Sequence, residues 1–232
     1  LLQFIDSSDE WITQRTGIRE RRWIAEGESI ETLSLEAANQ AIERAGIDRS
    51  EIGAVILSTT SHYHQTPALA PKLATELGIP DAAAYDISAA CAGFCYGLAQ
   101  AESIVRAGQA TYVLLIAGET ISEITDLNDR GTAFLFGDGA GAVVVGPSET
   151  NGIGPVVWGS DGSQEGVIWQ TADWHEAVET GEFPKLGMDG RAVFKWATSF
   201  IAQATKQCLD GAGLSPDQLD VFIPHQANDR IT

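Results

Sequence analysis

The sequence predicts an α/β fold with a substantially parallel sheet. Three apolar runs, over residues 54–60, 82–87 and 112–117, have the length and composition of buried strands, and helical patterns lie between them. Strands and helices that alternate at these lengths are typical of a parallel sheet with helices on its faces. A chain of 232 residues is long enough to bury a sizeable core in such a fold.

Caps and apolar periodicity predict the helices. Ser8 can cap a short helix that ends near Gly17, and a longer helix is expected from about Ile30 to Ala45, with Gly46 as its stop. Three further helical patterns cover residues 68–77, the stretch from Cys91 through Val105, and about 191–209.

The pattern changes after the third strand. Two short apolar runs around a glycine-rich turn, over residues 131–147, predict an antiparallel hairpin. Gly137, Gly139 and Gly141 lack the spacing of a dinucleotide-binding loop, and no helix follows them. Further short strands are expected at residues 156–159 and 221–224.

The end of the chain repeats the pattern of its beginning. Residues 45–52, before the first strand, match residues 212–219, before the strand expected at 221–224, and helix, glycine stop, polar linker and strand recur in the same order. In this alignment His225 takes the place of Ser58 at a strand end. We therefore expect two duplicated βαβ-type halves, residues 1–150 and 151–232, of which the second is incomplete in this chain.

Composition restricts the possible partners and the compartment. The chain holds 32 acidic and 14 basic residues, a formal net charge of -18, which disfavours binding to nucleic acid. No apolar stretch approaches the roughly 18 residues of a membrane span, so we expect a cytoplasmic protein that does not enter a membrane. Cys91, Cys95 and Cys208 lack the paired spacing of a zinc site, and no metal is expected.

Cys91 stands where the strand at 82–87 turns into a helix. Unpaired N–H groups and the positive end of the helix dipole stabilise a thiolate at such a place, so we expect a lowered pKa and a nucleophile. The alternative is a small apolar residue packed into a tight turn. These residues alone leave both interpretations open.

Trp11 and Arg15 lie four residues apart on the first predicted helix and therefore share a face. An indole and a guanidinium in this arrangement could hold one ligand together, or Trp11 could be a core residue beside a surface charge. Arg15 also belongs to a cluster with Arg19, Arg21 and Arg22, which could bind a phosphate or form a solvated loop.

Together these features resemble the thiolase-fold condensing enzymes, and among them the β-ketoacyl-acyl carrier protein synthase III family. The resemblance rests on motifs that occur in family order along the whole chain: Ser8–Ile12 with Arg15–Ile18, Ala89–Phe94, Asp129–Thr132, Phe136–Gly141 and Pro224–Ile231. Several separate motifs in order are far more specific than any one of them. The resemblance favours Cys91 as a nucleophile.

The resemblance implies a decarboxylating Claisen condensation between an acyl-CoA primer and malonyl-acyl carrier protein, through an acyl group on Cys91. His225 would bind the thioester carbonyl together with an asparagine that the family pattern puts near residue 255, beyond Thr232. Because that asparagine is not in this chain, we expect the polypeptide alone to be inactive in condensation, although Cys91 can in principle be loaded with an acyl group. No cofactor is implied, since the CoA thioester is itself a substrate.

The resemblance also assigns binding residues. Trp11 and Arg130 would enclose the CoA adenine with Arg15 near its phosphates, and Gly190, Phe194 and Asn228 would line the pantetheine tunnel. The acidic carrier protein would dock on Gln226, Asn228 and Arg230. The family pattern implies a homodimer in which Thr66 contributes to the partner's acyl pocket, with room for longer or branched primers.

Four other readings stay open at this point. Two are related enzymes, a starter acyltransferase of polyketide biosynthesis and a hydroxymethylglutaryl-CoA synthase, for which the sequence indicates no general-base glutamate. The third is a catalytically silent partner subunit, although such proteins usually lack the cysteine that this chain has. The fourth is a cysteine hydrolase that uses Cys91 and His225 as a dyad.

Overall fold

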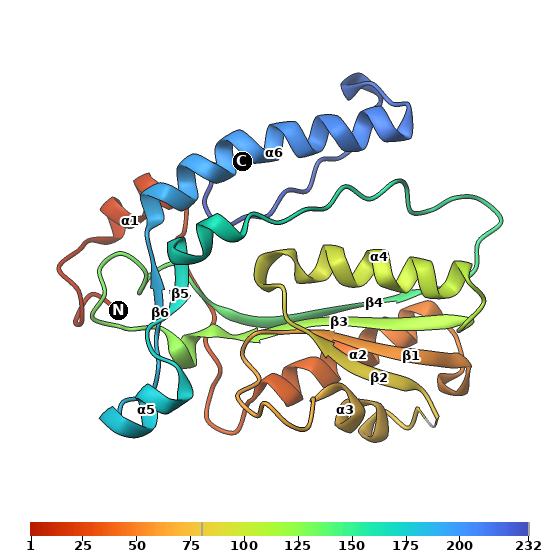
Figure 1. The fold of residues 1–232 in the computed structure, drawn as a ribbon, viewed down its shortest axis with the longest axis horizontal. Coiled ribbons are helices and arrows are strands. Elements are labelled where there is room, and N and C mark those ends of the chain that lie inside the picture. Colours follow the sequence, from red (N-terminus) through yellow and green to blue (C-terminus); the bar gives the residue numbers. More distant parts are fainter. Residues whose placement is uncertain (80, 232) are drawn as a thin grey trace. The chain divides into compact units, whose positions relative to one another are not determined.

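The computed structural model describes residues 1–79 and 81–231, which form two compact units (Figure 1). One unit contains residues 22–120 and 138–153, and we call it the sheet unit. The other contains residues 1–21, 121–137 and those from 154 onward, and we call it the second unit. The expected boundary near residue 150 stays a prediction.

The sheet unit contains four strands in the order β2-β1-β3-β4. These strands are β1 (Ile52–Ser58), β2 (Ala83–Ile87), β3 (Tyr112–Thr120) and β4 (Asp138–Val145). β1 runs parallel to both β2 and β3, whereas β4 is antiparallel to β3. The predicted parallel sheet is confirmed, and the strand ends at Ser58, Ile87 and Thr120 lie at one edge of it.

Helices cover both faces of this sheet: α2 (Ile30–Ala45) and α3 (Ala70–Glu76) lie on one face, and α4 (Gly93–Arg106) lies on the other (Figure 1). Alternate strand residues face opposite ways, so Val55 and Leu57 pack towards α2 and α3 while Ile56 packs towards α4. Burial on both faces explains why these strands read as continuous apolar runs.

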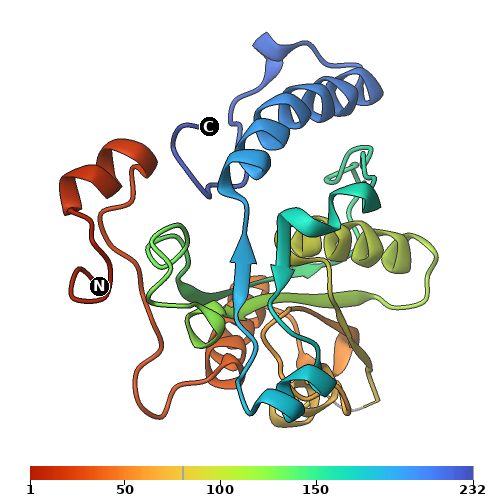
Figure 2. The same cartoon turned by 60° about the vertical axis from the view of Figure 1, so that its left-hand side comes forward.

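The second unit is built from shorter elements: α1 (Asp9–Thr16), β5 (Ile168–Gln170), α5 (Trp174–Thr180), β6 (Leu186–Met188) and α6 (Gly190–Ala212). β5 and β6 form an antiparallel pair, and α6 follows directly on β6 (Figure 2). A small core joins Ile5 and Ile12 to Ala133 and Phe134. The N-terminal segment therefore packs against residues from the middle of the chain.

Three strand predictions are wrong. Residues 131–137 form turns in place of the first hairpin arm, and β4 pairs with β3 from Asp138 to Val145. Residues 156–159 form no strand. Residues 221–224 form none either, and Val221 and Ile223 are 69% and 80% exposed, because no described strand lies beside them to complete their backbone hydrogen bonds.

Candidate active site

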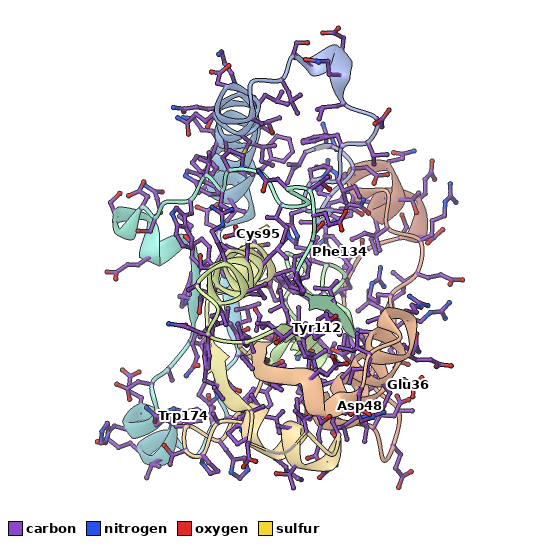
Figure 3. All side chains as sticks on the ribbon, turned by 90° about the vertical axis from the view of Figure 1, so that its right-hand side faces the viewer. Glu36, Asp48, Cys95, Tyr112, Phe134 and Trp174 are labelled. Atoms are coloured by element: carbon purple, nitrogen blue, oxygen red, sulfur yellow. The ribbon has the colours of Figure 1, made fainter. Side chains whose placement is uncertain are left out.

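Cys91 lies in a short 3-10 turn (Ala90–Ala92) between the end of β2 and the start of α4. Ala90, the residue before it, has a φ of 45°, in the left-handed region that costs an alanine about 1 to 2 kcal/mol. The chain thus turns sharply at Cys91 and leaves this residue exposed to solvent. Cys95, also exposed, lies one helical turn further along α4 (Figure 3).

Gly93 explains how this turn can lie so close to the sheet. A Cβ atom at this position would stand 1.9 Å from Ser58 Oγ, at the end of β1. Only a glycine permits the first turn of α4 to approach the strand this closely. Gly93 and Ser58 are both buried and fix the height of the Cys91 turn above the end of the sheet.

The pKa of Cys91 is raised from its ordinary value, contrary to the expected lowering. Although solvent reaches the side chain, crowding by protein atoms is the main cause; a backbone hydrogen bond opposes it, and the carboxylate of Glu119 raises the pKa further. The expected lowering rested on a helix that starts at Cys91, whereas α4 begins only at Gly93, after the 3-10 turn.

Trp11, Arg15 and Arg130 come together in the second unit, as predicted from their motifs. The Cζ atoms of Arg15 and Arg130 lie 4.7 and 4.9 Å from the centre of the Trp11 ring. Phe134 packs edge-on against the indole, with ring centres 5.7 Å apart, and holds its orientation. No ion pair engages either guanidinium within the described residues, so both remain able to bind an anion.

A cavity of about 590 Å³ opens beside this cluster. Trp11, Arg130, the predicted Gly190 and Gly131 of the Asp129–Thr132 motif line it, together with three residues that the sequence did not indicate, Met188, Asp189 and Arg191. Asp189 caps α6 by accepting from the N–H groups of Arg191 and Ala192. Phe194, the other residue predicted on α6, is half-buried one turn further on.

The segment from His225 to Arg230 also belongs to the second unit. Asp229 N–H donates to Thr16 O at 3.0 Å and ties the segment to the end of α1, while Asn228 Oδ1 accepts from Arg230 N–H. His225, Gln226 and Arg230 are exposed, and Asn228 is half-buried. The expected pairing of His225 with Cys91 stays a prediction, because the two residues belong to different units.

Comparison with known proteins assigns the family. Residues 85–162 match the 3-oxoacyl-[acyl-carrier-protein (ACP)] synthase III family. β-Ketoacyl-[acyl-carrier-protein] synthase III 1 of Streptomyces coelicolor is 52% identical over 243 residues, an alignment that covers 100% of this chain and 71% of that protein. The chain belongs to the β-ketoacyl-acyl carrier protein synthase III family. It is therefore an acyltransferase-type condensing enzyme.

Solved structures of synthase III proteins agree with this assignment. The Thermus thermophilus synthase III has a TM-score of 0.91 at 40% identity, over 99% of this chain and 72% of that one. A priming β-ketosynthase from a polyketide pathway has a TM-score of 0.96 at 45% identity, over 99% and 70%. The predicted thiolase-like α/β fold is confirmed, and the chain spans about 70% of the length of these relatives.

Two kinds of feature are absent from the described residues. None of their helices is long and apolar enough to cross a membrane. No group of three or more His, Cys, Asp or Glu side chains among them could hold a metal ion, and the rings of His62 and His64 stack on each other.

Proposed function

We propose that this synthase III condenses an acyl-CoA primer with malonyl-acyl carrier protein, with Cys91 as the acyl carrier. The observation that carries the proposal is the exposed thiol of Cys91 at a sharp strand-to-helix turn, in a chain about half identical to proteins named β-ketoacyl-acyl carrier protein synthase III. A nucleophile on such a turn can be approached by a thioester without hindrance from its own helix.

The chemistry proceeds in two stages. The Cys91 thiolate attacks the thioester carbonyl of the acyl-CoA, the C–S bond to CoA breaks, and CoA leaves as a thiol with the proton that Cys91 gave up. Malonyl-acyl carrier protein then loses carbon dioxide, and the resulting enolate attacks the acyl group on Cys91 and regenerates the thiolate. In this proposal His225 donates a hydrogen bond to the thioester oxygen on which the enolate charge develops.

Trp11, Arg15 and Arg130 are proposed to bind the nucleotide of CoA. Their support is geometric, because two cationic groups lie within 5 Å of one indole ring at the mouth of a cavity. Arg191 lines the same cavity and adds a third guanidinium for the phosphates. The tunnel for the pantetheine arm of the substrate would be lined by Gly190, Phe194 and Asn228.

Gln226, Asn228 and Arg230 are proposed to contact the carrier protein. Arg230 is exposed, and a local positive charge is required if an acidic partner is to dock on a chain of net charge -18. We also propose a homodimer in the cytoplasm. Its support is the outer edge of β2, which pairs with no described strand, and Thr66, which is exposed on the loop before α3.

Release of CoA tests the proposed function. Mixed with acyl-CoA alone, the protein should release one equivalent of CoA in a burst and then stop, because the acyl group stays on Cys91 until malonyl-acyl carrier protein arrives. Cys91→Ala should give no burst, and Cys95→Ala, which removes the neighbouring exposed thiol, should retain it. Continuous CoA release in buffer would instead indicate a hydrolase.

A second candidate is priming of polyketide synthesis. The priming β-ketosynthase from a polyketide pathway superimposes on this chain with a TM-score of 0.96 at 45% sequence identity. The two functions differ in the carrier protein that discharges Cys91. Comparing discharge rates with malonyl groups on fatty-acid and polyketide carrier proteins separates them.

A further inference from the structure

Glu119, near the end of β3, binds three consecutive residues of the segment that follows β1. Its Oε1 atom accepts from Thr60 N–H at 2.9 Å and from Thr60 Oγ1 at 3.2 Å. Its Oε2 atom accepts from Ser61 Oγ at 2.5 Å and from Thr59 Oγ1 at 3.3 Å. Ser61 Oγ in turn accepts from Thr120 N–H at 2.7 Å. One carboxylate thus ties this segment to the neighbouring strand.

This arrangement requires a carboxylate. Thr59 and Ser61 are only 5% and 1% exposed, so their hydroxyl groups need partners within the protein. An ionised carboxylate accepts at two oxygens and donates nothing, and its charge strengthens each hydrogen bond. A glutamine at position 119 would keep one acceptor oxygen. Its NH2 group, which can only donate, would face the donors of either Thr60 or Ser61.

The same segment contacts both elements that form the Cys91 turn. Thr59 N–H donates to Ile87 O at 3.1 Å, at the end of the strand that leads to Cys91. The preceding residue, Ser58, fills the space against Gly93 at the start of α4. Contacts therefore run from Glu119 through residues 58–61 to both sides of the Cys91 turn, and all of them lie within the sheet unit.

We propose that Glu119 is a positioning residue for Cys91. By holding Thr59–Ser61 at the end of the sheet, its carboxylate fixes the two strand ends against which the Cys91 turn rests. The proposal rests on Cys91 as the acyl acceptor. Both carboxylate oxygens are occupied by donors of the segment, which sets this role apart from that of a general base.

The carboxylate of Glu119 also acts on the Cys91 thiol through its negative charge. Glu119 raises the pKa of Cys91, so removal of that charge should lower it. The other charged groups on the elements packed against this turn are already engaged: Asp86 accepts from Leu69 and Ala70 N–H, Asp138 accepts from Ile24 N–H, and Glu102 pairs with Arg106.

Two variants distinguish the positioning role of Glu119 from the effect of its charge on Cys91. Glu119→Gln should slow single-turnover acylation of Cys91 by acyl-CoA about tenfold and shift the pH midpoint of its alkylation by iodoacetamide downward. Ser61→Ala removes a link without changing charge, so it should slow acylation and leave the midpoint in place. Glu43→Gln, an exposed glutamate on α2, is the matched control and should change neither.

Peptide-level mass spectrometry separates Cys91 from Cys95, whose alkylation profile should be the same in all variants. Unchanged acylation and an unchanged midpoint in Glu119→Gln would overturn the inference, and so would normal acylation in Ser61→Ala. If Glu119→Gln does not fold, the milder Ser61→Ala still tests the link. If the parent protein is not acylated at all, the proposed function fails, while the alkylation midpoints still test the effect of Glu119 on Cys91.

Discussion

Replacement of Gly93 by alanine tests how the turn that carries Cys91 is held. The new Cβ would lie 1.9 Å from Ser58 Oγ and 3.2 Å from Ser58 Cβ, whereas ordinary contacts begin at 3.4 Å, so the buried hydroxyl must rotate away or one of the two elements must shift. Overpacking of this kind costs about 1 to 3 kcal/mol, and alanine returns up to about 1 kcal/mol through its helix propensity. We expect a net loss of about 1 to 2 kcal/mol in the free energy of unfolding.

In Gly93→Ala, the rate of Cys91 acylation should fall more strongly than the free energy of unfolding. Cys91 lies two residues before Gly93, and a displacement of about 1 Å at a reacting group can slow a reaction about a hundredfold. The assays are urea unfolding and single-turnover transfer of the acyl group from acyl-CoA to Cys91. A Gly93→Ala protein as stable and as rapidly acylated as the parent would refute the reasoning.

Two controls make the test specific. Gly211, inside α6, has only ordinary contacts at its Cβ position, the nearest being Pro155 at 3.5 Å, so Gly211→Ala should stabilise by about 0.5 to 1 kcal/mol. In a Ser58→Gly background, Gly93→Ala should cost much less than in the parent, since the contact that causes the strain is gone.

Four further outcomes are expected. Trp11→Ala should weaken CoA binding about fivefold to thirtyfold in calorimetry, because both cation–π contacts are lost, while Trp11→Phe should retain part of the affinity. Arg230→Glu should raise the KM for malonyl-acyl carrier protein and leave loading of Cys91 unchanged; equal loss of both would contradict the docking role. Thr66→Phe should narrow the range of acyl-CoA primers that load Cys91, and a ladder of chain lengths with the same preference before and after would contradict a role in the acyl pocket. Because the pKa of Cys91 is raised, its alkylation should need a higher pH than that of an ordinary thiol, and a midpoint below the ordinary value would restore the helix-dipole argument.

Local signals predicted α1, α2, α3, α4, α6 and the parallel strands, but they missed α5. Helix α2 begins after a Ser29 cap and ends before Gly46, and its observed bounds are those expected from its sequence. Trp11 and Arg15 meet because residues four apart on a helix share a face. Such features depend only on neighbouring residues, so the sequence contains them.

Features that depend on distant residues were missed. β4 was placed in a local hairpin, because nothing in residues 131–147 indicates that their partner is β3. The strand expected at 221–224 needs a neighbour that the described residues do not supply. Glu119 stands 59 residues from Thr60 in the sequence, so only the folded sheet brings the carboxylate to its donors. Sequence motifs predict Cys91 as the nucleophile, and the structure adds the contacts that hold its turn.

The central claim is that Cys91 carries the acyl group between the two substrates. The most direct measurement is a peptide map after exposure to acyl-CoA, first in buffer and then with malonyl-acyl carrier protein, made on a polypeptide that also carries the asparagine expected near residue 255. We predict one acyl adduct, on the peptide that contains Cys91, which persists in buffer and disappears when malonyl-acyl carrier protein is added. An adduct on Cys95 or Cys208 in place of Cys91, or one that water removes as fast as malonyl-acyl carrier protein does, would contradict it.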